Sequence, residues 1–310
     1  MSTPEFDFYD KTVLKSYNLD RTMRDQLSML DTLDVFTRKH CENVANLTCR
    51  LCQYLHLGTD FTVYATICAY LHDIGKLFIP ASILQKPGAL TDEEYSVMKT
   101  HTSLGYKMCM ENPKLRDYAA GTIYHHEALN GTGYPEGLTK KDIPLVGQII
   151  RVADEYDAIV SKRQYKSHIG ITDTLKILIE NAIPKSVVLK SMEQSSKLGK
   201  INPKVLRKLF KVVIDDTEYE ISCIYEYTAH LADQIKRLES VYEYHTKMVE
   251  THSEKKKSYY EECIKMLLEK NETLQNYQFV LEEYRTAEVK RKEIIDNLYN
   301  EIKMIKKLRV

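Results

Sequence analysis

The distribution of glycine and proline divides the chain at residue 204. All 11 glycines and all 8 prolines precede this position, and residues 204–310 contain neither. Turns and loops usually need one of the two, because glycine reaches left-handed backbone angles and proline fixes φ. The absence of both residue types predicts that the C-terminal part is almost wholly helical.

This C-terminal part also carries a heptad-like pattern of apolar residues. The pattern is strongest in two stretches, Leu231–Tyr242 and Leu274–Ile305, and charged residues fill the positions between. Such spacing is typical of a coiled coil. The charged run 254–257 interrupts the pattern, so that the helix either bends back there as a hairpin or continues with a stutter. We expect residues 224–310 to mediate homodimerisation or to bind a protein partner.

The part before residue 204 has the pattern of helices joined by short turns. Strand-like alternation is weak throughout, and Thr91 with Glu94 forms a capping box that starts a helix leading toward His101. Further helices are expected at about 62–72, 115–126, 144–162, 172–181 and 204–214. We predict an all-α protein in three parts: a helical lead-in at 1–29, a domain at 30–215 and a coiled-coil tail at 216–310.

Composition excludes several classes of protein. Lysine plus arginine and aspartate plus glutamate are equal at 44 each, which gives no general attraction for DNA or an anionic membrane. No signal sequence or membrane span is apparent, so we expect a cytoplasmic protein. Seven scattered cysteines do not suggest a disulfide framework. Cys49 and Cys52 lie in a helix-periodic segment, and we interpret them as buried thiols, not a zinc or redox site.

Two histidine motifs point to a metal centre. His72 and Asp73 are adjacent at the end of an apolar helix, where burying both would be costly without compensation from a metal. His125 and His126 strengthen the case, because two neutral imidazoles can both be ligands whereas two protonated ones would repel each other.

Imidazoles and carboxylates together are typical ligands of divalent transition metals. The candidate ligands number seven: His40, His72, Asp73, His101, His125, His126 and Asp154. Seven ligands are too many for one ion but about right for two ions that share a bridging carboxylate. A pair of metals about 4 Å apart is the usual arrangement for in-line displacement at phosphorus.

The motif from His72 to Lys76, together with Gly133-Tyr134-Pro135, resembles the HD-GYP phosphodiesterases. These are bacterial enzymes of the HD hydrolase superfamily that hydrolyse cyclic di-GMP, and the resemblance covers about residues 30–215. It implies an HD-type helical bundle, which the predicted coiled coil would follow. It also implies a metal-dependent phosphodiesterase that opens cyclic di-GMP to linear pGpG, with GMP as a further product left open.

The resemblance assigns the metal ligands and the nucleophile. One metal would be bound by His40, His72, Asp73 and Asp154. The second would be bound by Asp73, as the bridge, with His101, His125 and His126. A hydroxide between the two metals would be the nucleophile. Mixed histidine and carboxylate ligands favour iron or manganese, and zinc remains open.

The resemblance also assigns the residues around the metals. Lys76 would act in catalysis with Asp73 by contacting the scissile phosphate. Arg163 and Lys166 would bind the phosphates of the dinucleotide, and Tyr134 would contact the substrate. Asp157 would support the ligands from behind.

Three positions depart from the family pattern. Phe36 replaces a glutamate that binds a third metal in some members, so we expect two metals. Ala128 stands where arginine or lysine is usual, and Gln164 replaces a proline. No metal ligand is lost, so we expect an active enzyme. Ala128 leaves open another cyclic dinucleotide, such as cyclic GMP-AMP, as the substrate.

The second class of function is a non-catalytic adaptor that senses a nucleotide and acts through its coiled coil. The complete ligand set argues against it, because a sensor has no need of two hydrolytic metals.

Overall fold

The computed structural model describes residues 32–161, 171–183 and 198–310. These residues form helices, and their only β-type pairing is an isolated bridge between Asn130 and Thr139. The predicted all-α fold is confirmed. The predicted lead-in at 1–29 lies outside the described residues. The chain divides into two compact units, which are Met1–Val213 with Lys307–Val310, and Ile214–Lys306.

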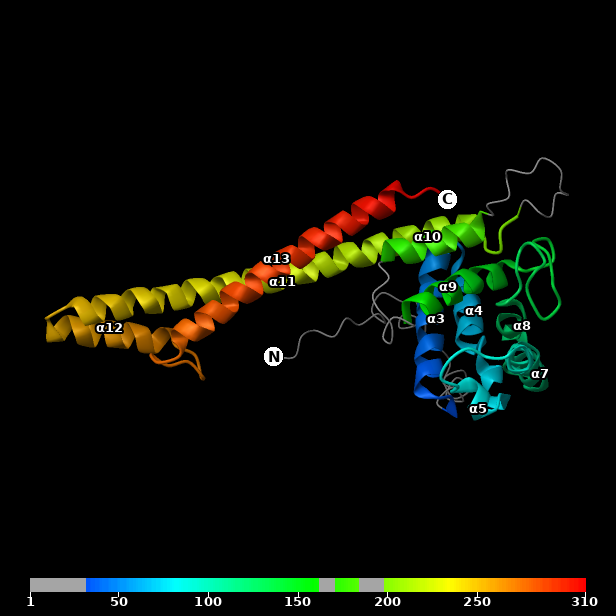
Figure 1. Ribbon diagram of the computed structural model, residues 1–310, viewed down its shortest axis with the longest axis horizontal. Coiled ribbons are helices and arrows are strands. Elements are labelled where there is room, and N and C mark those ends of the chain that lie inside the picture. The colour runs from blue at the N-terminus through cyan, green and yellow to red at the C-terminus, as the bar shows by residue number, and fades with distance from the viewer. Residues whose placement is uncertain (1–31, 162–170, 184–197) are drawn as a thin grey trace. The chain divides into compact units, whose positions relative to one another are not determined.

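The first unit is built around a group of packed helices (Figure 1). Its longer helices are α3 (Val35–Tyr54), α4 (Thr59–Leu71), α7 (His101–Glu111), α9 (Leu145–Ser161) and α10 (Ile171–Ala182). Helix α3 packs against α4 and α9, and the short α8 (Ala120–Tyr124) packs against α4, α7 and α9. The 3-10 helix η3 (Ile74–Phe78) follows α4 and packs against α7. These contacts bring the ends of several helices to one place.

Helix α3 begins at a capping residue and buries one face. The Asp34 carboxylate accepts hydrogen bonds from the backbone N–H groups of Phe36 and Thr37, which compensates donors left free at a helix start. Cys41, Cys49 and Cys52 on its inner face are fully buried and form no disulfide. The interpretation of the last two as buried thiols is confirmed, and burial raises the pKa of Cys52 to about 12.

Of two helices predicted from the sequence, one begins where expected and the other is divided into two short elements. The capping box of Thr91 and Glu94 is present and starts α6 (Asp92–Lys99), as expected. The helix expected at 115–126 is instead two short elements, η4 (Arg116–Tyr118) and α8. Tight bonds between residues three apart, such as Tyr118 N–H to Leu115 O and Thr122 N–H to Ala119 O, replace the regular α-helical ladder there.

The second unit is a helical hairpin. Helix α11 (Pro203–Glu250) runs far beyond the predicted 204–214, and its residues from Ile214 onward belong to this unit with α12 (Glu254–Leu267) and α13 (Tyr277–Lys307). The chain leaves the helix at 251–253, so the charged run 254–257 forms the start of α12 and not the turn. Ion pairs from Glu218 to Lys306 and from Glu239 to Arg285 show that α11 and α13 run antiparallel.

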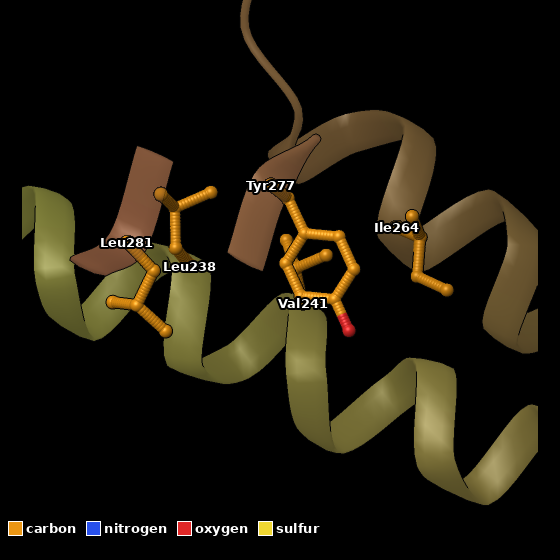
Figure 2. Packing of buried hydrophobic residues seen from close by; sticks show 5 residues of the cluster. All are labelled: Leu238, Val241, Ile264, Tyr277 and Leu281. Carbon is orange, nitrogen blue, oxygen red and sulfur yellow. The ribbon is translucent and has the colours of Figure 1, made fainter. Parts of the chain in front are cut away.

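A small hydrophobic cluster joins the three helices of this unit (Figure 2). Leu238 and Val241 of α11 pack with Ile264 of α12 and with Tyr277 and Leu281 of α13. A second cluster, Ile221 with Ile295 and Ile302, lies farther along α11 and α13. Several residues of the predicted heptad pattern therefore pack against one another within one chain.

The C-terminal part is almost wholly helical, as predicted, but the loop between α12 and α13 was not predicted. Residues 268–276 leave the helix without glycine or proline. Side chains bind the backbone N–H groups that have no helical acceptor in this loop. Asn276 Oδ1 accepts from Thr273 N–H, and the Glu272 carboxylate accepts from Glu269 N–H. Arg237 also pairs with Glu272 and fixes this loop on α11. No described helix is both long enough and apolar enough to cross a membrane.

Candidate metal centre

The seven predicted ligands converge from five places in the first unit. His40 lies on α3, and Asp154 lies on α9. The junction of α4 and η3 supplies His72 and Asp73, and His101 is the first residue of α7. His125 and His126 directly follow α8. The chain segments that carry these side chains are far apart in sequence, and only the packing of α3, α4, α7, α8 and α9 brings them together.

Asp73 lies between two groups of imidazole nitrogens. Its Oδ2 atom is 3.3 Å from His72 Nε2 and 3.7 Å from His40 Nε2. Its Oδ1 atom is 3.3 Å from His101 Nε2 and 3.9 Å from His125 Nε2. The two oxygens of one carboxylate thus face two separate ligand groups, which is the arrangement that a bridging carboxylate requires.

The backbone fixes which nitrogen of each ring is free to bind a cation. Three Nδ1 atoms lie within hydrogen-bond distance of a backbone carbonyl: His72 with Ala69 at 2.6 Å, His101 with Met98 at 2.7 Å and His125 with Gly121 at 2.9 Å. A carbonyl oxygen only accepts, so each Nδ1 donates and each neutral ring carries its lone pair on Nε2. Such bonds are the usual support for metal-binding histidines.

The free nitrogens then face one another. His101 Nε2 is 3.2 Å from His125 Nε2, and His40 Nε2 is 3.3 Å from His72 Nε2. His101 and His125 both carry a lone pair on Nε2, and two lone pairs cannot form a hydrogen bond. Asp73 Oδ1 is buried and has no hydrogen-bond partner among the described residues. A cation between these atoms would compensate both features, and the imidazole and carboxylate donors fit a divalent transition metal.

Asp154 and Asp157 complete the surroundings of His40. Asp154 Oδ1 is 3.0 Å from His40 Nε2, and its Oδ2 is 3.9 Å from His126 Nδ1. On the other side of the ring, His40 Nδ1 donates to Asp157 Oδ2 at 2.6 Å. Asn43 donates to the second oxygen of Asp157 at 3.1 Å. Asn43 was not singled out from the sequence, although its position one turn after His40 on α3 places it on the same helix face.

Two glycines allow the ligand-bearing elements to approach. A Cβ atom at Gly75 would overlap the backbone carbonyl of His101, and one at Gly121 would overlap the carbonyl of Cys68. Gly75 therefore matters for the close packing of η3 on α7. This packing brings His101 to the Oδ1 side of Asp73.

The electrostatics favour ligand-ready protonation states at His101, His125, His126 and Asp73. Burial lowers the pKa of His101, His125 and His126, so these rings are neutral near pH 7. Burial alone would raise the pKa of Asp73, but the Lys76 ammonium and His72 outweigh it and hold the pKa well below its usual range. The carboxylate of Asp73 is therefore ionised under the same conditions.

The pKa of His40 determines how we expect metal binding to depend on pH. Burial disfavours its protonation, but hydrogen bonds with Asp154 and Asp157 outweigh burial and raise its pKa to about 10. A metal needs the lone pair on Nε2, so the proton must leave on binding. We expect the apparent affinity for manganese to rise about tenfold per pH unit between about pH 7 and 9 and to level off near pH 10.

Titration of the metal-free protein with manganese against a competing chelator, at several pH values, measures this slope. Asp157→Asn is the matched variant. It removes one of the carboxylates that stabilise the His40 imidazolium, so the slope should flatten at lower pH. An affinity that does not change with pH in the unmodified protein would show that His40 releases no proton.

A cavity of about 1110 Å³ opens beside the histidines. It is lined by His101, His126, Lys76, Tyr134 and Arg151, among others, and Phe36 and Ala128, two of the departures from the family pattern, also lie on its wall. The Tyr134 ring stacks on His126 with 4.7 Å between centroids. Lys76 forms an ion pair of 2.5 Å with Asp73 Oδ2. Arg163 and Lys166, the predicted phosphate-binding residues, and Gln164 lie outside the described residues.

Sequence reasoning missed further residues of the cavity wall. Tyr95 of α6 lines the cavity and meets the edge of the Tyr134 ring. Arg151 lies one turn before Asp154 on α9 and donates to the backbone carbonyl of Glu127. Tyr95 lies about one turn after Thr91 at the start of a predicted helix, and Arg151 lies about one turn before the predicted ligand Asp154. These spacings could have indicated both residues, but neither residue belongs to a motif of metal ligands.

The family follows from a comparison with known proteins. Residues 23–184 match the HD domain family, and this range is just over half of the 310-residue chain. The chain belongs to the HD domain family.

Curated relatives refine this assignment. The chain is 42% identical over 136 residues to a cyclic di-GMP phosphodiesterase of Thermotoga maritima, over 43% of this chain and 37% of the relative. It is 35% identical over 155 residues to a cyclic di-GMP phosphodiesterase of Pseudomonas aeruginosa, over 50% and 37%. It is 33% identical over 153 residues to a 3'3'-cGAMP-specific phosphodiesterase of Vibrio cholerae, over 49% and 33%. The resemblance to the HD-GYP phosphodiesterases is confirmed, although the match spans only about a third of each relative's length.

Proposed function

We propose that this chain is a metal-dependent phosphodiesterase that hydrolyses a cyclic dinucleotide, with cyclic di-GMP as the leading substrate. The observation that carries the proposal is Asp73, whose two oxygens face two separate groups of histidine Nε2 atoms. Support also comes from relatives that are named cyclic di-GMP phosphodiesterases. The expected product is linear pGpG, with further hydrolysis to GMP left open.

The ligand set and its neighbours suggest a division of roles. Two bound divalent ions, with iron or manganese favoured over zinc, would supply an activated water and stabilise negative charge on the phosphate. His40, His72 and Asp154 would hold one ion, and His101, His125 and His126 the other, with Asp73 shared. Lys76 lines the cavity and would stabilise charge that develops on the phosphate. Asp157 orients the His40 ring.

The cavity supports a substrate of dinucleotide size. Its volume of about 1110 Å³ exceeds that of most small-molecule sites. Tyr95 and Tyr134 offer aromatic rings on its wall, to which a nucleobase could stack. The imidazoles of His101 and His126 reach the same cavity, so a substrate bound there would have a phosphate close to the candidate metals.

A second substrate, 3'3'-cyclic GMP-AMP, is favoured by two observations. One relative is named as specific for it, and Ala128 lines the cavity where the family usually has arginine or lysine. Loss of a long cation there would remove one contact to a phosphate or a base edge. Comparison of kcat/KM for the two cyclic dinucleotides on one preparation decides between them.

Metal analysis combined with turnover of cyclic di-GMP by the purified protein tests the proposal. Two equivalents of metal and formation of pGpG that stops when a chelator is added are expected. Metal-free protein that binds cyclic di-GMP without hydrolysing it would instead support the nucleotide-sensing adaptor. Protein that does neither would contradict both functions.

We further propose that the α11–α13 hairpin serves association, as a homodimer or with a protein partner, and does not build the active site. The hairpin already uses Leu238 and Leu281 in its own core. Other large apolar side chains on it remain exposed, including Val249, Met266 and Phe279, and are available for contact with another chain.

Truncation tests this role. A chain that ends at Asp216 keeps every candidate ligand, so it should fold, bind two metals and hydrolyse substrate at close to the full-length rate. If the hairpin mediates homodimerisation, light scattering should show a dimer for the full-length chain and a monomer for the truncated chain. A truncated protein that is still a dimer would favour partner docking. A folded but metal-free and inactive one would show that the hairpin supports the catalytic site.

A further inference from the structure

Glu127 directly follows the two histidines in the sequence, but its carboxylate binds backbone N–H groups of the glycine loop. The residue is buried, with 1% of its surface exposed. Its Oε1 atom accepts a hydrogen bond from the backbone N–H of Glu136 at 2.7 Å, and its Oε2 atom accepts one from the N–H of Leu138 at 2.8 Å. An ionised carboxylate is suited to two such bonds because both oxygens accept, and bonds to a charged acceptor are stronger than neutral ones.

The glycine loop, residues 130–138, is attached to the same segment at two further points. Gly133 packs so closely on Glu127 and Ala128 that a Cβ atom would overlap their backbone. The N–H of Tyr134 donates to the carbonyl of His126 at 3.2 Å. The Tyr134 ring then stacks on the His126 ring, with an interplanar angle of 25°.

These contacts make the loop a fixed wall of the cavity. Thr132, Gly133 and Tyr134 line the cavity, and the bonds to Glu127 hold the part of the loop that follows them. Without the carboxylate, the half-buried N–H groups of Glu136 and Leu138 would lose their acceptor and the loop would hold Tyr134 less firmly. The distances of Asp73 from the histidine nitrogens would be kept, because the hydrogen bonds of the Glu127 carboxylate in the described residues go to the loop and not to Asp73 or to a ligand nitrogen.

We propose that Glu127 is a positioning residue that sets the affinity for the dinucleotide by holding the glycine loop, and with it Tyr134, against the part of the substrate that does not react. This inference rests on the proposed phosphodiesterase function. The inference predicts different effects on two kinds of substrate. A cyclic dinucleotide is long enough to use the loop, whereas a small diester such as bis(p-nitrophenyl) phosphate needs only the metals and Lys76.

The variant Glu127→Gln tests the inference. Glutamine keeps one acceptor oxygen but turns an NH₂ group toward the second backbone N–H. The KM for cyclic di-GMP should rise about tenfold with kcat almost unchanged, as expected for the loss of a charge-assisted bond. Turnover of bis(p-nitrophenyl) phosphate and the metal content should stay at the unmodified level. Tyr134→Ala should produce the same selective rise in KM without altering Glu127.

Glu136→Gln is the matched control. It makes the same change of charge on the loop, but the Glu136 side chain is exposed and only its backbone N–H takes part. The KM for cyclic di-GMP and the turnover of bis(p-nitrophenyl) phosphate should both stay unchanged in this variant. A second readout is hydrogen exchange of the Glu136 and Leu138 amides in metal-free protein, which should be faster in Glu127→Gln and unchanged in the control.

The results separate the inference from the function on which it rests. If the unmodified protein hydrolyses neither diester, the proposed function fails, while amide exchange still decides whether Glu127 holds the loop. Unchanged exchange and an unchanged KM in Glu127→Gln would overturn the inference. Loss of metal, of fold or of activity on both substrates would also overturn it, because Glu127 would then support the metal centre as a whole.

Discussion

Replacement of Asp73 by alanine is expected to remove both metal ions and to lower phosphodiesterase turnover by about 10³-fold or more. The reason lies in the geometry of one carboxylate. Asp73 Oδ2 faces His72 and Oδ1 faces His101, each at 3.3 Å. Removal of this side chain takes one ligand from both candidate ion sites and leaves only neutral imidazoles at the His101 group. Elemental analysis and turnover of cyclic di-GMP on the same preparation measure the effect.

Asp157→Ala is the matched control for this experiment. It removes a neighbouring carboxylate that touches His40 Nδ1 but does not face the His101 group. Its effect should be smaller, about 10- to 100-fold in metal affinity, as is typical of residues that orient a ligand. Retention of both metals and of turnover in Asp73→Ala would show that the site assignment is wrong. Loss of a single metal would show that Asp73 binds one ion without bridging.

The sequence allowed the fold class and the candidate ligands to be predicted for a clear physical reason. Helices follow from apolar periodicity and from side-chain caps, and both are local properties of the chain. The capping box of Thr91 and Glu94 formed as expected. The pairs His72-Asp73 and His125-His126 stood out because adjacent buried polar residues need compensation.

Features that depend on the backbone could not be predicted in this way. The choice of Nε2 as the free nitrogen is set by the carbonyls of Ala69, Met98 and Gly121, and any residue type supplies a carbonyl. The close approach of Gly75 to His101 depends on how η3 packs against α7. Local patterns say nothing about either distance, and the two-sided surroundings of Asp73 were expected only from the resemblance to the HD-GYP phosphodiesterases.

In the C-terminal tail, the helices were predicted from the sequence but the loop between them was not. The absence of glycine and proline predicted helix, and α11, α12 and α13 occupy most of it. The interruption at 268–276 was missed because its turns are made by asparagine, threonine and glutamate side chains that also occur in helices. The hairpin follows from contacts between residues far apart, such as Arg237 with Glu272, which a heptad pattern alone cannot distinguish from contacts between two chains.

Replacement of Lys76 by alanine should leave the metals in place and lower turnover by about 100-fold or more. Lys76 lines the cavity, and its ammonium group pairs with Asp73 Oδ2. In the metal-free protein, burial lowers the pKa of Lys76, but the pair with Asp73 outweighs burial and raises it, so the side chain is charged. A bound metal would neutralise Asp73 and leave this ammonium free to stabilise charge on the phosphate.

Lys86→Ala is the matched control, because Lys86 also pairs with a carboxylate, that of Glu94, but does not line the cavity. Metal content and turnover should both be unchanged in this variant. In Lys76→Ala, an unchanged rate with full metal content would remove Lys76 from catalysis. A loss of metal together with rate would give Lys76 a different role, because the ammonium would then be needed to hold Asp73 in the orientation that faces both histidine groups.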